Sequence, residues 1–146
     1  YLRLNKTVMF REKIQEKIET SNQSQLSICS ALDITPQNFN GFLKGQRPLP
    51  YDTLVKVMNY LHLSVGLSNI GYAKLSADNL PEIFKRRIVA CNLKVTDLSK
   101  HTGVSGASIS SFINGKRSLP ARNMEKIMKV LRLDVLPLKS KTQLTQ

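Results

Sequence analysis

Residues 98–119 read LSKHTGVSGASISSFINGKRSL, and this stretch decides the fold. A short helix is predicted over residues 94–102, and Gly103 marks the turn that follows it. Ser105 has the hydroxyl that caps the N-terminus of a second helix. Gly115 ends that helix after about ten residues, because glycine readily adopts the left-handed conformation found at helix C-termini. The stretch therefore predicts two short helices joined by a tight turn.

The same pattern occurs 70 residues earlier in the chain. Residues 41–65 align without a gap with residues 111–135. Thr35 followed by Pro36 supplies the corresponding N-cap and first helical residue. Identical pairs include Phe42/Phe112, Gly45/Gly115, Arg47/Arg117, Leu49/Leu119, Pro50/Pro120, Lys56/Lys126, Met58/Met128, Leu61/Leu131, Leu63/Leu133 and Val65/Val135. We interpret this register as the tandem duplication of one small domain.

Helical periodicity extends through both copies. Apolar residues recur every fourth position at Phe10, Ile14 and Ile18, and again at Leu80, Phe84 and Ile88. Each copy therefore opens with an amphipathic helix. A short helix is predicted over residues 24–32, and a last helix follows the Leu-Pro pair of each copy. The fold class predicted is all-α, with two small helical bundles in tandem, and the resemblance described below implies that both are of helix-turn-helix type.

The periodicity also predicts the domain boundaries. We expect a first helix-turn-helix domain over residues 1–64, an apolar linker over 65–77, a second domain over 78–136 and a flexible basic tail over 137–146. The linker is too apolar for a free tether, so we expect it to pack between the copies and fix their orientation. The apolar residues concerned are Val65, Leu67, Ile70, Tyr72 and Leu75, with Val135, Leu136 and Leu138 as their expected neighbours.

Residues 98–119 resemble the helix-turn-helix core of the lambda-repressor-like family, also called the Cro or xenobiotic-response-element family. The resemblance rests on a small residue in the first helix (Ser99, Cys29), on the turn Gly103-Val104-Ser105, and on an apolar residue four positions after the cap (Ile109, Phe39). It covers about residues 8–63 and 78–133. The first copy departs from it with Asp33 in place of the turn glycine, and aspartate tolerates the left-handed region.

The resemblance implies that the outward face of the second helix of each pair reads base edges in the DNA major groove. Amide side chains can form bidentate hydrogen bonds to adenine, whereas serine discriminates less. The first copy is therefore expected to read sequence more strictly than the second. The outward positions are Pro36, Gln37, Asn38, Asn40 and Gly41 in the first copy, and Gly106, Ala107, Ser108, Ser110 and Ser111 in the second.

Further residues are expected to contact DNA around each reading helix. The caps Thr35 and Ser105 belong to this set, and the resemblance implies that Gln25 bonds a phosphate. Its counterpart is Val95, which cannot do so. Cations and backbone N–H groups just beyond a helix end are suited to phosphates and fix docking without reading sequence. The candidates are Lys44 and Arg47 in the first copy, with Asn114, Lys116 and Arg117 in the second.

Composition supports a polyanionic partner. The chain has 146 residues, 22 Lys and Arg against 10 Asp and Glu, and a formal charge of +12. Residues 1–70 carry a net +3 and residues 71–146 a net +9. Such basicity on a folded scaffold is typical of proteins that bind nucleic acids. The run Lys85-Arg86-Arg87 fits either a further phosphate contact or the solvated face of its helix.

The sequence also argues against other classes of protein. It has no apolar run of the ~20 residues needed to span a bilayer and no signal peptide, so we expect a cytoplasmic protein with no membrane partner. Cys29 and Cys91 are expected to be reduced core residues, and His62 and His101 isolated residues on helix surfaces. We expect no catalytic residue, no metal site and no cofactor, and hence no enzyme.

Two functions remain open at this point. The first is a sequence-specific regulator of double-stranded DNA, most like a repressor of a phage or mobile element, encoded by a bacterium or phage and associated with the nucleoid. The alternative is a protein-interaction or antitoxin-like module that uses the same fold, and a homodimer or a protein partner fits either. A basic surface around the reading helices would favour DNA, whereas an exposed apolar face on them would favour a protein partner.

The two copies could act as a pseudo-dimer within one chain. Helix-turn-helix dimers place their reading helices about 34–36 Å apart, which is one turn of DNA. Because the two reading helices differ, we expect unequal half-sites. In the alternative interpretation, the second copy only anchors the protein to DNA or dimerises.

Overall fold

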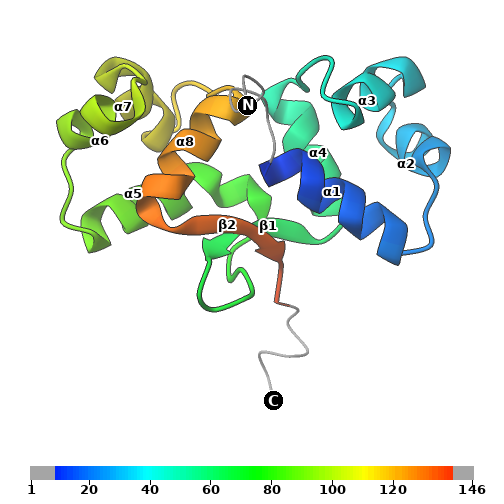
Figure 1. Cartoon of the computed structure of the whole chain (residues 1–146), viewed down its shortest axis with the longest axis horizontal. Helices are drawn as coiled ribbons and strands as arrows, with labels where there is room; N and C mark the ends of the chain where they lie inside the picture. Colours follow the sequence, from blue (N-terminus) through cyan, green and yellow to red (C-terminus); the bar gives the residue numbers. More distant parts are fainter. Residues whose placement is uncertain (1–8, 140–146) are drawn as a thin grey trace.

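The computed structural model describes residues 9–139, which are mostly α-helical (Figure 1). The first half contains α1 (Met9–Thr20), α2 (Gln25–Leu32), α3 (Pro36–Leu43), α4 (Tyr51–Tyr60) and strand β1 (Leu63–Leu67). The second half contains a 3₁₀ turn, η2 (Ala77–Asn79), then α5 (Leu80–Ala90), α6 (Val95–Thr102), α7 (Gly106–Ile113), α8 (Ala121–Leu131) and strand β2 (Leu133–Pro137). The α-helices lie where the apolar periodicity and the caps predict them.

The structure differs from the all-α prediction by a small sheet. β1 pairs antiparallel with β2, with Leu63 opposite Pro137, Val65 opposite Val135 and Leu67 opposite Leu133. Each strand has five residues, too few for an alternating pattern to stand out. The two strands are also far apart in the sequence, so local sequence patterns could not reveal that they pair. The strands nevertheless join the two halves directly.

The segment between β1 and α5 is held against β2 by backbone hydrogen bonds. Ser68 N–H donates to the Arg132 carbonyl at 3.0 Å, and Ala73 N–H donates to the Pro137 carbonyl at 2.8 Å. Lys139 N–H donates in return to the Ala73 carbonyl at 2.9 Å. β1 crosses the boundary expected between residues 64 and 65, and β2 includes Pro137 from the expected tail. The segment is therefore attached to the second half at its start, through Ser68, and near its middle, through Ala73.

One cluster of buried apolar side chains runs through both halves. It includes Phe10 and Ile14 of α1, Phe84 of α5, and Val65 and Val135 of the two strands. Cys29 belongs to it and Cys91 packs against it, and both thiols are free. The prediction of a core cysteine is therefore confirmed for Cys29, whereas Cys91 is only half-buried at the edge of the core. The two helical bundles share a core rather than closing separately.

Polar and aromatic contacts also cross from one half to the other. Phe10 N–H in α1 donates to Glu125 Oε2 in α8 at 2.8 Å, and this hydrogen bond is buried. The ring of Tyr51 in α4 meets the ring of Phe112 in α7 edge-on, with centroids 5.8 Å apart. Phe112 makes a second edge contact with Phe84 at 5.3 Å. These contacts fix the orientation of the halves by packing.

The resulting arrangement places the two short helix pairs at opposite ends of the molecule (Figure 1). The α2–α3 pair lies at one end and the α6–α7 pair at the other, with the sheet across the middle. α3 and α7 lie toward the same edge, and the chain leaves β2 on the opposite side. Both short pairs can therefore be presented to one extended partner.

Both histidines, His62 and His101, lie within the described residues 9–139. His62 is exposed, but it occupies the turn between α4 and β1 with φ of 59° and is not on a helix surface as expected. His101 is on α6, where Nδ1 lies 2.8 Å from the Asp97 carbonyl.

Within residues 9–139 no helix is long and apolar enough to cross a membrane. In the same range no three His, Cys, Asp or Glu residues gather as metal ligands would.

Candidate nucleic-acid interface

The first short helix pair is organised by side-chain caps. Ser24 Oγ accepts a hydrogen bond from Ser27 N–H at 3.0 Å at the start of α2. Asp33 ends α2 in the left-handed conformation, with φ of 56°, which is the conformation predicted for it. Thr35 Oγ1 then accepts from Asn38 N–H at 3.3 Å at the start of α3. The turn between α2 and α3 is thus set by local chemistry.

The second short helix pair has the same plan with different residues. Asp97 Oδ2 accepts from Lys94 N–H at 3.0 Å at the start of α6. Gly103 supplies the left-handed residue, with φ of 78°. Ser105 Oγ accepts from Ser108 N–H at 3.1 Å and lies 2.8 Å from Ser108 Oγ. The Ser108 side chain is therefore already engaged by the cap, which leaves it less free to contact a ligand.

α3 and α7 end in the same glycine motif. Gly45 has φ of +77° and Gly115 has φ of +74°. In α3 the Gly41 carbonyl accepts from Gln46 N–H at 2.8 Å, and in α7 the Ser111 carbonyl accepts from Lys116 N–H at 2.8 Å. This hydrogen-bonded reversal is the Schellman motif. It turns the chain sharply and places the cations that follow beside each helix end.

The predicted contact residues other than Gly41 lie at the surface, where some are exposed and others are half-buried. The inward side chains Phe39 and Phe42 of α3, and Ile109 and Phe112 of α7, are buried. The exposed members of the predicted set are Gln25, Thr35, Gln37, Asn38, Lys44 and Arg47 in the first half and Ser105, Asn114, Lys116 and Arg117 in the second. The half-buried members are Asn40, Ser108, Ser110 and Ser111.

Gly41 is a correction to the predicted reading face. It was expected to face outward, but it is buried beneath the side chain of Arg47. A β-carbon at Gly41 would lie 2.9 Å from Arg47 Cγ. The missing side chain therefore leaves the space in which Arg47 crosses α3.

Arg47 and Asn38 form a unit that the sequence did not reveal. Arg47 Nη1 donates to Asn38 Oδ1 at 2.8 Å on the exposed face of α3. Arg47 was expected to bind phosphate only, but its guanidinium donates a hydrogen bond to a side chain of the predicted reading face. Because Arg47 occupies the amide oxygen, the Asn38 Nδ2 donor is the group left facing outward. The signal that could have revealed this unit is the glycine at position 41, where the second half has Ser111.

Arg11 of α1 is a second residue that sequence reasoning missed. Its guanidinium lies directly over Gly45, so that any β-carbon there would collide with it. The corresponding space at Gly115 is open, with no atom within 4 Å of a β-carbon placed there. The residue at the position of Arg11 in the second half is Pro81. Arg11 thus adds a cation beside Lys44 and Arg47 at the end of α3.

The surface of α3 and α7 is polar. The large apolar side chains that are exposed within residues 9–139 are Leu26 (67%), Ile70 (40%) and Val89 (72%). None of them belongs to α3 or α7. The outward faces of these helices therefore have no apolar patch of the kind that marks a protein-docking surface.

Burial shifts two ionisable groups near the helix pairs. It raises the pKa of Tyr51 to about 12, with smaller contributions from the Asp52 and Asp78 carboxylates. It also raises the pKa of the Cys29 thiol. Both groups are therefore neutral near pH 7, so Tyr51 acts as an aromatic packing residue and Cys29 as a small apolar one.

Comparison with known proteins supports this description of the second half. Residues 83–138 match a protein family described as Helix-turn-helix. No curated protein and no solved structure matches the chain significantly. The matched segment begins in α5 and ends just after β2, so it includes the whole α6–α7 pair. Residues 83–138 are thus similar to a helix-turn-helix domain, and α6 and α7 are the central helices of the matched segment.

Proposed function

We propose that this protein is a regulator that binds double-stranded DNA in a sequence-specific manner, with α3 and α7 entering the major groove. One observation carries the proposal. Both helices are short, capped and polar on their outward faces, both lie toward the same edge of the molecule, and each is followed by a turn that contains cationic residues. This is the geometry in which a helix-turn-helix protein reads bases and binds phosphates.

The surface favours DNA over a protein partner. A protein-interaction or antitoxin-like module would require an exposed apolar face on α3 or α7, and the described residues offer none. The net charge of +12 would also favour a polyanion. By its resemblance to the lambda-repressor-like family, the regulator is proposed to be a repressor of phage or mobile-element type that acts on the bacterial nucleoid.

We further propose that the chain arose by tandem duplication and binds DNA through two heads. One head consists of α2 and α3, and the other consists of α6 and α7. The two halves have the same order of four α-helices and one strand, and the equivalent residues are 70 positions apart. The heads are unequal, because α3 carries Gln37 and Asn38 and is followed by Arg47, whereas α7 presents mainly serine. The preferred DNA is therefore expected to have two half-sites about one helical turn apart, with one half read more strictly.

The test is selection of binding sites from random duplex DNA with the full chain. An enriched motif with a strict half and a relaxed half would support both the DNA-binding function and the two-headed arrangement. Enrichment of one half alone would indicate that α7 only anchors the protein. Recovery of no motif would contradict the proposed function.

Gln37 is expected to read a base directly. Gln37→Ala removes an exposed amide at the start of α3 and should cost about 1–3 kcal/mol on the selected site, with relaxed preference at one base pair. Electrophoretic mobility shifts on a panel of single-base variants measure both effects. Gln15→Ala removes an equally exposed amide from α1 and serves as the control. An equal loss on every sequence would show that Gln37 does not face a base.

Arg47 is expected to influence specificity through Asn38, whereas Arg117 is expected only to bind phosphate. Arg47→Ala should alter preference at the base pair opposite Asn38, because it releases the amide oxygen for bonding to DNA. Gly41→Ser should have the same effect, since its β-carbon displaces the Arg47 side chain. Arg117→Ala is the matched control and should weaken all sequences alike. The same base-variant panel measures these changes, and a uniform loss in the Arg47 variant would rule out the coupling.

A further inference from the structure

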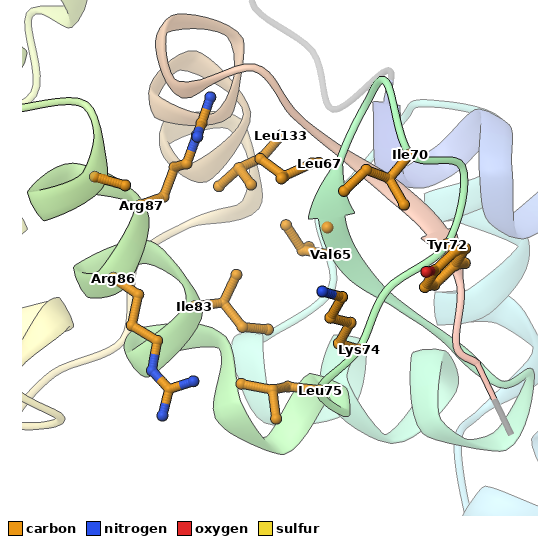
Figure 2. Close-up of a pocket in the computed structure, with 12 residues that line it drawn as sticks. Val65, Leu67, Ile70, Tyr72, Lys74, Leu75, Ile83, Arg86, Arg87 and Leu133 are labelled. Atoms are coloured by element: carbon orange, nitrogen blue, oxygen red, sulfur yellow. The ribbon is translucent and has the colours of Figure 1, made fainter. Parts of the chain in front are cut away.

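A pocket of about 430 Å³ lies where the two halves meet (Figure 2), and its lining residues do not include any residue of α3 or α7. β1 and Leu133 of β2 form one wall, the segment between β1 and α5 forms the second, and α5 forms the third. Its volume lies in the range of about 300–1,000 Å³ that is typical of small-molecule sites. The main apolar lining residues are Val65, Leu67, Ile70, Leu75, Ile83 and Leu133.

The walls of this pocket are held by hydrogen bonds outside it. Ser68 and Ala73 attach the connecting segment to the backbone of the second half, at 3.0 and 2.8 Å. Arg87 of α5 donates from Nε to the Leu131 carbonyl at the end of α8, at 2.7 Å. The three walls are therefore fixed by contacts that leave the apolar interior open.

The charged groups of the lining are all cations. Arg86 is paired with Glu82 at 2.7 Å, and its guanidinium points away from the pocket (Figure 2). The Arg87 guanidinium lies against α8. Lys74 differs, because its ammonium points toward the middle of the lining residues while the residue remains exposed to solvent (Figure 2). Within residues 9–139 the Lys74 ammonium has no hydrogen bond or ion pair.

We infer that this pocket binds a small amphipathic anion, with an aliphatic or aromatic body against the apolar walls and a single carboxylate-like head on Lys74. Lys74 is exposed and its ammonium has no partner among the described residues, so its N–H groups are free to donate charge-assisted hydrogen bonds to an anionic head. A neutral ligand would gain no such bond between opposite charges, and a cationic ligand would be repelled by the three basic residues. Such a ligand would touch both halves and stabilise their junction. The inference concerns ligand binding alone and does not depend on DNA binding.

The test is isothermal titration calorimetry of the full chain with three probes that share one tail: octanoate, 1-octanol and octylammonium. Octanoate should bind about tenfold more tightly than 1-octanol, as expected for one charge-assisted contact. Octylammonium should show no binding. Equal affinity for the three probes, or no binding of octanoate, would overturn the proposal.

Three variants locate the site. Lys74→Met should remove the preference for octanoate over 1-octanol while retaining binding of 1-octanol. Ala90→Trp places a large ring at the edge of the lining and should abolish binding of both probes. Val89→Trp adds the same ring one residue away on an exposed position outside the lining and should bind octanoate as the native chain does. Unchanged octanoate affinity in Lys74→Met or Ala90→Trp would overturn the assignment, and far-UV circular dichroism confirms that each variant is folded.

Discussion

Binding of the full chain to its selected DNA site should weaken steeply as salt is raised. Each phosphate neutralised by a cation releases counterions, so the logarithm of the binding constant falls with the logarithm of salt by about 0.9 per contact. About four phosphate contacts at one head predict a slope near −3.6, and docking of both heads predicts about twice that value. Between 50 and 200 mM salt the two-headed mode should then lose affinity by about 10⁴-fold. Fluorescence anisotropy over this range measures the slope.

Charge-removal variants make this expectation specific to the proposed surface. Arg11→Ala and Lys116→Ala each remove one cation beside α3 or α7 and should reduce the slope by about one. Lys139→Ala removes a cation that follows β2 and lies over the ring of Tyr72, 4.6 Å from its centroid, rather than beside α3 or α7, and should leave the slope unchanged. A slope near zero with affinity retained would contradict the electrostatic part of the proposal. A slope that depends equally on Lys139 would place the DNA on a different face.

Replacing Phe112 should have the largest effect on stability. Phe112 is 1% exposed and makes two edge-on ring contacts, with Phe84 and with Tyr51 of the other half. Phe112→Ala should lower the free energy of unfolding by about 3–5 kcal/mol, through lost burial and the cavity left behind. Chemical denaturation followed by circular dichroism measures the change. Because Phe112 belongs to a core shared by both halves, unfolding should remain a single transition.

Phe42 provides the matched control for the ring contacts. It occupies the equivalent position in α3 and is 2% exposed, but the ring pairs observed in residues 9–139 do not include it. Phe112→Leu should therefore cost about 1–3 kcal/mol more than Phe42→Leu, since each aromatic pair contributes about 0.5–1.5 kcal/mol. Equal losses would show that the edge contacts add nothing beyond burial. Two separate transitions would show that the halves unfold independently.

The sequence predicted most of what depends on local chemistry. The helices follow from apolar residues at every third or fourth position, and the turns follow from Thr35, Ser105, Gly45 and Gly115. These signals work because a cap or a left-handed glycine acts within a few residues of its partner. Both short helix pairs could therefore be placed without a structure.

Features that depend on distant residues could not be predicted in the same way. The pairing of β1 with β2 joins segments that are far apart, and neither has a pattern strong enough to indicate a strand. The contact of Arg47 with Asn38 depends on how the chain leaves α3, and that of Arg11 with Gly45 on how α1 packs. The predicted set of contact residues was therefore wrong at Gly41, and it did not include Arg11. In each case tertiary packing decided the position of a side chain whose local preferences were weak.

The register of the sheet has a consequence for how binding depends on protein concentration. Val65 lies opposite Val135, its equivalent 70 residues later, and the neighbouring pairs are arranged symmetrically about these two valines. Separate subunits that meet in this way dissociate on dilution, and their occupancy of DNA then rises cooperatively. Here a covalent connection keeps the two valines together at any dilution. If both heads bind DNA as proposed, occupancy of the site should therefore follow a simple hyperbola with a Hill coefficient near one. Each head would then be free to prefer a different half-site, because it never has to match a copy of itself.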